Sequence, residues 1–138
     1  KKIEDKENLL NLNEDSSQIP FENAIKITKG LGSRKILVFY EIDCSYCKSL
    51  EKYELSQVND ITVYNFLYVN DDKESASWKK AKSIWCSSDV KKTWNDFILN
   101  DYLAKNTKSC VTPFEQNKVL AKKLGVKGTP TIFFSNSL

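Results

Sequence analysis

The sequence predicts one α/β domain, and three features of its 138 residues support this prediction. A strand pattern over residues 34–41 leads directly into a helical pattern, and a second strand pattern follows at residues 61–69. A long helical block and a further helix then precede a short apolar strand at residues 131–134. Because a helix joins the first two strands, we expect a right-handed crossover and therefore a parallel pair.

The N-terminal residues 1–19 are polar and acidic-leaning, and they contain one apolar cluster, formed by Leu9, Leu10 and Leu12. We interpret them as a lead-in or linker segment, partly helical, before a domain over residues 20–138. Pro20 stands where the first turn of a helix tolerates proline, and the apolar side chains of residues 21–28 share one helical face. We therefore expect a short helix over residues 21–28, ended by a turn at residues 30–33.

Residues 34–41 predict the first strand of the sheet. Its side chains are apolar on both sides, which indicates a central strand that is covered on both faces. They are Ile36, Val38 and Tyr40 on one side and Leu37 and Phe39 on the other. A helix is expected over residues 45–56. Beta-branched and aromatic side chains then predict the second strand at residues 61–69, and a turn is expected at residues 70–72.

Residues 73–112 are interpreted as a helical insertion with two or three helices. Apolar side chains recur there at helical spacing, and they include three tryptophans that we expect in the core, Trp78, Trp85 and Trp94. Asp89 ends a Ser-Ser-Asp run that predicts a helix N-cap. A further helix is expected over residues 113–124, with Pro113 in its first turn and Gly125 as its C-cap.

The composition excludes several classes of function. Histidine is absent, so Ser-His-Asp catalysis, Cys-His catalysis and histidine-ligated metal sites are impossible. The formal net charge of +3 is spread along a sequence of mixed charges, which gives no electrostatic case for a nucleic-acid partner. No run of about 18 apolar residues is present, so no transmembrane helix is expected.

A Cys-x-x-Cys pair, Cys44 and Cys47, stands where the first strand ends and the next helix begins. Helix N-termini offer unpaired N–H groups and a partial positive charge, which favour a thiolate over a thiol. We interpret Cys44 as the attacking thiolate of a thiol–disulfide exchange site and Cys47 as the resolving thiol. Ser45 and Tyr46 are expected to tune the attacking thiolate and to contact the substrate. An inert disulfide fits less well, because so small a ring stabilises a fold little.

The other two cysteines, Cys86 and Cys110, lie in the helical insertion. Zinc sites made of four cysteines usually contain two close pairs, and this sequence contains one, so no metal site is expected. The economical pairing joins Cys44 with Cys47 and Cys86 with Cys110. The second disulfide would stabilise the fold by roughly 3 kcal/mol in the chain-entropy model, and it would indicate an oxidising compartment.

A Gly-Thr-Pro-Thr run, which contains Thr129 and Pro130, enters the last strand. Proline at the entrance of a core strand removes a backbone donor from the sheet. A cis bond between Thr129 and Pro130 would explain this position and would leave the backbone of Thr129 free for a substrate strand. An ordinary trans turn explains the residues equally well.

The strand–Cys-x-x-Cys–helix unit and the Thr-Pro run resemble the thioredoxin fold, and in particular the bacterial periplasmic disulfide isomerases of the DsbC/DsbG group. The resemblance spans residues 20–136 and includes Leu-Gly-Ser-Arg-Lys at 31–35, Ile-Trp-Cys at 84–86, the lone Cys110 and Leu-Gly-Val-Lys-Gly-Thr-Pro at 124–130. It implies a thioredoxin-like fold with a helical insertion before the last strand. It also implies a cis bond at Pro130 and a structural disulfide between Cys86 and Cys110.

Two positions depart from the patterns of these families. Ser45 replaces the glycine or proline that is common in the isomerase pair, which leaves the redox potential open. Val38 stands six residues before the first cysteine, where thioredoxin carries a buried acid. This substitution argues against a reductant of the thioredoxin type.

The resemblance implies an enzyme that isomerises or reduces wrong disulfides through Cys44 and Cys47, with no cofactor beyond that pair. It implies unfolded or misoxidised exported proteins as substrates, a membrane electron donor of the DsbD type, and a periplasmic location after removal of a signal peptide. A DsbA-like dithiol oxidase stays open as an alternative. So does a non-enzymatic module that binds Cu(I) or a client through the two cysteines.

The resemblance also implies parts that this sequence does not contain. An N-terminal dimerisation domain would make the protein a homodimer. One more antiparallel strand and a C-terminal helix are expected after the strand at residues 131–134. Either this sequence is incomplete, or that strand leaves an unpaired edge of the sheet.

Overall fold

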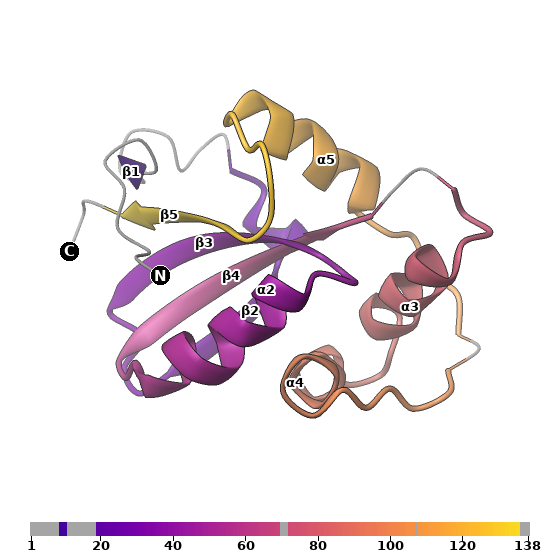
Figure 1. Ribbon diagram of the computed structural model, residues 1–138, viewed down its shortest axis with the longest axis horizontal. Helices are drawn as coiled ribbons and strands as arrows, with labels where there is room; N and C mark the ends of the chain where they lie inside the picture. The colour runs from indigo at the N-terminus through magenta and orange to yellow at the C-terminus, as the bar shows by residue number, and fades with distance from the viewer. Residues whose placement is uncertain (1–8, 11–18, 70–71, 107, 136–138) are drawn as a thin grey trace.

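A mixed sheet forms the centre of the computed structural model, which describes residues 9–10, 19–69, 72–106 and 108–135 (Figure 1). In this part of the chain, the strand order is β1-β5-β3-β4-β2. The strands are β1 (Leu9–Leu10), β2 (Ile25–Lys29), β3 (Arg34–Glu41), β4 (Ile61–Tyr68) and β5 (Thr131–Ser135). β3 and β4 are parallel, as the predicted crossover requires, and β5 is antiparallel to β3. The central strand is therefore β3, as its apolar pattern predicts.

Helices cover both faces of this sheet. They are η3 (Phe21–Asn23), α2 (Ser45–Ser49), η4 (Leu50–Glu54), η5 (Leu55–Gln57), α3 (Ala76–Trp85), α4 (Val90–Asn100) and α5 (Phe114–Lys123). Figure 1 shows α5 on one side of the sheet and α2 and α4 on the other. The helix predicted over residues 45–56 is thus present, but its middle part, η4, is a π-helix and its last turn, η5, is a 3-10 helix. Short π segments often occur at functional sites.

Successive side chains of β3 point to opposite faces of the sheet, and this divides the core into two clusters. Val38 and Tyr40 belong to the cluster beneath α2 and α4, together with Trp94. Leu37 and Phe39 belong to the cluster beneath α5. All five side chains are 0% exposed. The helix α2, which carries the Cys-x-x-Cys pair, therefore follows a strand that is packed tightly on both faces.

The N-cap that the sequence predicts in the helical insertion is present, whereas the predicted C-cap of the following helix lies one residue earlier than expected. Asp89 is the N-cap of α4 and accepts a hydrogen bond from the Lys92 N–H at 3.2 Å. Trp94 is fully buried, and Trp78 and Trp85 pack partly buried against the same cluster. At the end of α5, Leu124 is the C-cap and Gly125 takes a φ of +81°, the left-handed conformation that glycine adopts at low cost.

The helix predicted over residues 21–28 is wrong. After the single turn of η3, the chain forms strand β2, which pairs antiparallel with β4. Ile25 is buried, Lys26 is exposed and Ile27 is half-buried, an alternation that belongs to a strand. Isoleucine and threonine are stiff at χ1 and favour strands, and pairing with β4 gives their backbone groups hydrogen-bond partners. The turn at residues 30–33 is present, whereas residues 70–71 of the predicted turn lie outside the described residues.

The expected lead-in segment contains a strand where we predicted partial helix. Leu9 and Leu10 form β1, which pairs parallel with Phe134 and Ser135 of β5. This pairing covers the edge of β5 at Phe134 and Ser135, so the expectation of an unpaired edge is corrected there. The rest of the segment before residue 19 lies outside the described residues.

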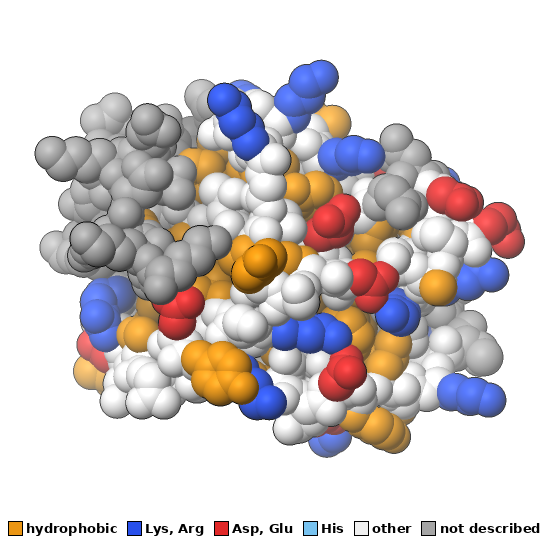
Figure 2. All heavy atoms as spheres, in the orientation of Figure 1, with side chains coloured by type: hydrophobic (Ala, Val, Ile, Leu, Met, Phe, Trp, Pro, Cys, Tyr) orange, Lys and Arg blue, Asp and Glu red, His pale blue; other side chains and the backbone are white. Residues whose placement is uncertain are grey.

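Charged side chains of both signs are interspersed over the face shown in Figure 2. Lysine and arginine outnumber aspartate and glutamate by 21 to 18 in the whole sequence, so neither sign dominates. In the part of the chain that the structure describes, no helix is long and apolar enough to span a bilayer.

Candidate redox site

The Cys-x-x-Cys pair lies at the N-terminus of α2, directly after β3. Cys44 is the N-cap residue, and its Sγ accepts a hydrogen bond from the Cys47 N–H at 3.1 Å. Its own N–H donates to the Glu41 carbonyl oxygen at 3.1 Å, which fixes the turn from strand to helix. A sulfur in this position receives an N–H bond and the positive end of the helix dipole, and both stabilise a negative charge.

A disulfide joins Cys44 and Cys47, and the two residues differ in their access to solvent. Cys47 is 0% exposed and belongs to the core, whereas Cys44 is only half-buried. Ser45 is exposed between them, and Tyr46 is 69% exposed. A partner thiol or disulfide that arrives from solvent therefore meets Cys44 and the side chain of Tyr46 first.

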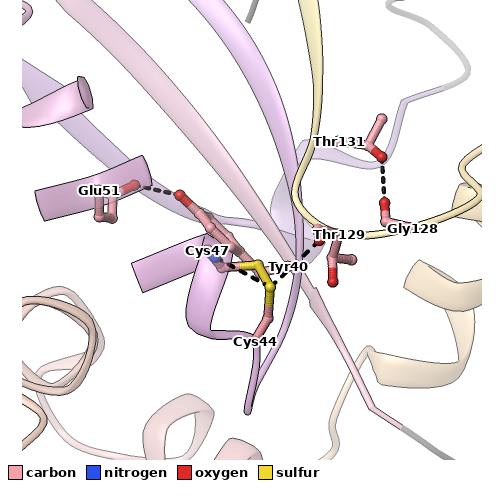
Figure 3. The surroundings of a disulfide bond; sticks show 7 residues. All are labelled: Tyr40, Cys44, Cys47, Glu51, Gly128, Thr129 and Thr131. Carbon is pink, nitrogen blue, oxygen red and sulfur yellow. Dashed lines mark hydrogen bonds between the residues drawn. A yellow bond between two sulfur atoms is a disulfide. The ribbon is translucent and has the colours of Figure 1, made fainter. Parts of the chain in front are cut away.

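The fold brings the Thr-Pro run against this pair, across 85 residues of sequence. Cys44 Sγ lies 3.5 Å from the carbonyl oxygen of Thr129, and Figure 3 shows that oxygen pointing toward the sulfur. The bond between Thr129 and Pro130 is cis. Thr131 Oγ1 donates a hydrogen bond to the Gly128 carbonyl oxygen and closes the turn. Of the residues predicted to contact substrate, Thr129 thus borders Cys44, and Ser45 and Tyr46 follow Cys44 directly in the chain.

The helical insertion is attached to the redox site by two ion pairs that the sequence did not indicate. Asp43, the residue before Cys44, accepts a bond from Lys80 Nζ at 2.8 Å and another from the Ser77 hydroxyl. The hydrogen bond from Lys80 is the main reason that the pKa of Asp43 is lowered. On the next turn, Lys48 Nζ lies 2.6 Å from Asp101 Oδ1. The insertion therefore holds both ends of the first turn of α2.

A buried polar pair joins β3 to η4, and the sequence did not indicate it. The Tyr40 hydroxyl donates a hydrogen bond to Glu51 Oε2 at 2.5 Å, and both residues are buried (Figure 3). Burial raises the pKa of the Glu51 carboxyl, because a charge is poorly solvated there. A glutamate four residues after Cys47 would ordinarily be expected on the exposed face of a helix. The π-helical geometry of η4 and the contact with β3 place Glu51 in the interior instead.

The second disulfide joins Cys86 and Cys110, in the predicted pairing, over a sequence separation of 24. Cys86 ends α3 as its C-cap and is 8% exposed, whereas Cys110 lies in an exposed irregular segment. The bond therefore ties the loop after α4 back to the end of α3.

Replacing Cys86 and Cys110 together by serine should lower the free energy of unfolding by about 3 kcal/mol, because the unfolded chain regains the entropy of an open loop. Denaturant unfolding monitored by tryptophan fluorescence measures this change. Opening of the Cys44–Cys47 bond in a graded glutathione buffer should stay as in the parent protein. A folded double variant with altered opening at Cys44 would contradict a purely structural role.

A surface pocket of about 310 Å³ lies beside Cys110, and its lining includes Trp78 and Phe114. Neither Cys44 nor Thr129 lines it, so the redox pair does not sit at the bottom of this hollow. Within the described ranges, no cluster of three or more Cys, Asp or Glu side chains is arranged to hold a metal ion.

Comparison with known proteins places this geometry in a family. A model of the thioredoxin-like domain matches residues 21–137. The chain is 40% identical over 119 residues to a probable thiol:disulfide interchange protein DsbC of Bordetella parapertussis, an alignment that covers 86% of this chain and 41% of that protein. Against the thiol:disulfide interchange protein DsbC of Escherichia coli K12, identity is 32% over 103 residues, with 73% and 42% covered. The chain thus spans less than half the length of these relatives.

A solved structure agrees with the sequence relatives. The disulfide interchange protein from Neisseria gonorrhoeae superposes with a TM-score of 0.73 at 32% identity, over 83% of this chain and 81% of that chain. The thioredoxin-like fold with a helical insertion is therefore confirmed. The chain belongs to the thioredoxin-like domain family, and its Cys-x-x-Cys pair at Cys44 and Cys47 makes it similar to the DsbC-type thiol:disulfide interchange proteins.

Proposed function

We propose that this domain is a protein thiol–disulfide oxidoreductase that isomerises or reduces wrong disulfides in exported proteins. One observation carries the proposal. The half-exposed Cys44 Sγ sits at a helix N-terminus opposite Thr129, while its partner Cys47 is buried behind it. An attacking thiolate needs access and charge stabilisation, and a resolving thiol needs proximity and protection from solvent.

The reaction begins with the pair reduced. The Cys44 thiolate attacks one sulfur of a client disulfide, a bond forms between Cys44 and the client, and the second client sulfur leaves as a thiolate that takes a proton from water. The freed client thiol can attack a different client disulfide or the mixed disulfide, which isomerises the client with no net oxidation. Alternatively, Cys47 attacks Cys44 Sγ and releases a reduced client, and the pair is left oxidised.

We infer that the client binds as an extended segment across Thr129 and Pro130, with Tyr46 as an exposed apolar contact. Backbone pairing of this kind suits unfolded chains of many sequences. The reductive cycle needs a donor of two electrons, for which a membrane protein of the DsbD type is proposed. The Cys86–Cys110 disulfide supports a periplasmic location, because structural disulfides persist in oxidising compartments.

Replacing Cys47 by serine should trap mixed disulfides between Cys44 and client proteins, because the group that resolves them is gone. The variant is incubated with a misoxidised disulfide protein and examined on non-reducing gels, where the adducts should rise from trace amounts to a major species. The control is the variant in which Cys44 and Cys47 are both replaced by serine, and it should form no adducts. A Cys47 variant that accumulates no adduct would contradict the proposal.

The midpoint of the Cys44–Cys47 bond in glutathione buffers tests the direction of exchange. A value of about −120 to −180 mV suits an isomerase or an oxidant, whereas about −270 mV suits a reductant. Comparing refolding of a scrambled disulfide protein with oxidation of a reduced one then separates the proposed isomerase from a dithiol oxidase.

A further inference from the structure

An aspartate, Asp43, stands directly before the attacking cysteine in the chain. Consecutive Cα atoms are about 3.8 Å apart, so no rotamer takes the Asp43 carboxylate farther than roughly 10 Å from Cys44 Sγ. This distance is close to the Debye length of about 8 to 10 Å at physiological salt, so a carboxylate there still repels a thiolate. An unpaired Asp43 would therefore oppose the negative charge on which the attack by Cys44 depends.

Helix α3 of the insertion engages both oxygens of this carboxylate. Lys80 Nζ donates to Asp43 Oδ1 at 2.8 Å, and the Ser77 hydroxyl donates to Asp43 Oδ2. Ser77 and Lys80 are three residues apart in α3, so they lie on one face of the helix. The helix is anchored in the core by Ala81 and Ile84, which are both 0% exposed. The carboxylate is thus held against a cation that belongs to a firmly packed element.

The first charged side chain of α2, Lys48, has a different partner. Lys48 Nζ lies 2.6 Å from Asp101 Oδ1 and 4.5 Å from the centroid of the Phe97 ring. The charge of Lys48 contributes less than the Lys80 bond to the lowered pKa of Asp43. Among the residues that the structure describes, Lys80 is the one cation that forms an ion pair with Asp43. Neutralisation of Asp43 therefore depends mainly on Lys80.

We propose that Lys80 is a positioning residue of the redox site, which neutralises the Asp43 carboxylate so that Cys44 can carry the attacking negative charge. The effect is exerted on the reduced protein, because the sulfurs of the closed disulfide carry no charge for Asp43 to repel. The inference rests on the proposed function, in which Cys44 is the attacker. It gives the helical insertion a part in setting the redox equilibrium, in addition to its part in the core.

The equilibrium that Lys80 shifts is the opening of the Cys44–Cys47 bond by glutathione. Two glutathione thiols give up two electrons and form one glutathione disulfide, and the Cys44–Cys47 bond takes up these electrons and breaks. Of the two protons that the glutathione thiols release, one goes to Cys47 and the other goes to solvent, because Cys44 remains a thiolate. A negative charge near Cys44 makes this product less stable, so the population of the closed disulfide rises.

Replacing Lys80 by glutamine should lower the equilibrium constant for this opening about threefold, the effect of two like charges roughly 7 Å apart in water. Thiol alkylation in graded glutathione buffers measures the constant. Lys80→Arg keeps the cation and should retain the parent value. Lys79→Gln removes the neighbouring lysine of α3, which pairs with Glu74, and should also retain it. Lys80 is 42% exposed, so these variants should fold, and circular dichroism establishes that they do.

Titration of Cys44 alone gives a second measurement. In a Cys47→Ser background the structural disulfide stays closed, so Cys44 is the one thiol that ionises, and its thiolate is followed by ultraviolet absorbance against pH. Adding Lys80→Gln should move the midpoint to higher pH, with about threefold less thiolate at a pH below it. Lys79→Gln in the same background should leave the midpoint in place.

Removing the carboxylate separates an action through Asp43 from a direct action of Lys80 on the sulfur. In an Asp43→Asn background, Lys80→Gln should change the equilibrium constant by much less than threefold, because no carboxylate remains to be neutralised. The threefold change should also shrink in about 1 M potassium chloride, where charges are screened beyond about 3 Å.

Three results would overturn the inference: no change on Lys80→Gln, an equal change with and without Asp43, or a change that persists at high salt. No client is present in these experiments. They are therefore independent of the client trapping by Cys47→Ser, and a failure of the positioning role is distinguishable from a failure of the proposed function.

Discussion

Replacing Cys44 by serine should reduce thiol–disulfide exchange to the rate observed without protein. The attacking group must be a thiolate, and a serine hydroxyl at the same helix N-terminus is not ionised at neutral pH. The N–H of Cys47 and the start of α2 would still be present, but no sulfur would lie opposite Thr129. Refolding of a scrambled disulfide protein measures the loss directly.

The double replacement of Cys86 and Cys110 by serine is the matched control for this experiment. It makes the same chemical change at the disulfide outside the site, and it should keep the exchange rate at a temperature where the variant is folded. If Cys44→Ser retained exchange while Cys47→Ser lost it, the assignment of attacker and resolver would be reversed. If both retained exchange, the redox site would lie elsewhere.

Replacing Trp94 by alanine should lower the free energy of unfolding by about 3 to 5 kcal/mol, the largest stability effect that we predict. The side chain is 0% exposed and packs on Tyr40, so its removal leaves a cavity in the core beneath the redox helix. Since small domains have a total stability of roughly 5 to 15 kcal/mol, this loss is a large fraction of it. Urea unfolding followed by far-ultraviolet circular dichroism measures the change.

Trp94→Phe keeps most of the buried volume and should cost well under half as much. An alanine variant as stable as the phenylalanine variant would show that the insertion contributes little to the core. We also expect the alanine variant to loosen the contact of α4 with Tyr40, so its Cys44–Cys47 midpoint should be measured beside that of the parent.

Most of the fold was predictable because apolar side chains recur at strand or helix spacing over long stretches of the sequence. The strand at Arg34–Glu41 is apolar on both sides, and its neighbour at Ile61–Tyr68 is β-branched and aromatic, so both elements were assigned correctly. Residues 25–28 were misassigned because the apolar side chains of residues 21–28 match one face of a short helix. Pairing with β4 decides in favour of a strand, and pairing partners are distant in sequence.

The site was predictable in part for a similar reason. Cys44 and Cys47 belong to a local motif, and the Thr-Pro run is a second one, so each could be found without knowing the fold. Glu51 and Asp43 belong to no motif. Glu51 is buried and contacts Tyr40, and Asp43 contacts Lys80, and only the packed structure brings these partners within reach.

Each of the two disulfides has one sulfur-bearing residue open to solvent and one in the core, and this asymmetry dictates the regiochemistry of their cleavage. A thiol from solvent reaches Cys44 in one bond and Cys110 in the other, so the leaving groups are the buried Cys47 and Cys86. A leaving thiolate departs faster when its charge is stabilised or quickly neutralised. Cys47 leaves in the first turn of a helix, whereas Cys86 leaves at a helix C-terminus, where the dipole opposes negative charge. The same small thiol should therefore open the Cys44–Cys47 bond faster than the Cys86–Cys110 bond. The redox pair can then react repeatedly while the structural disulfide stays closed.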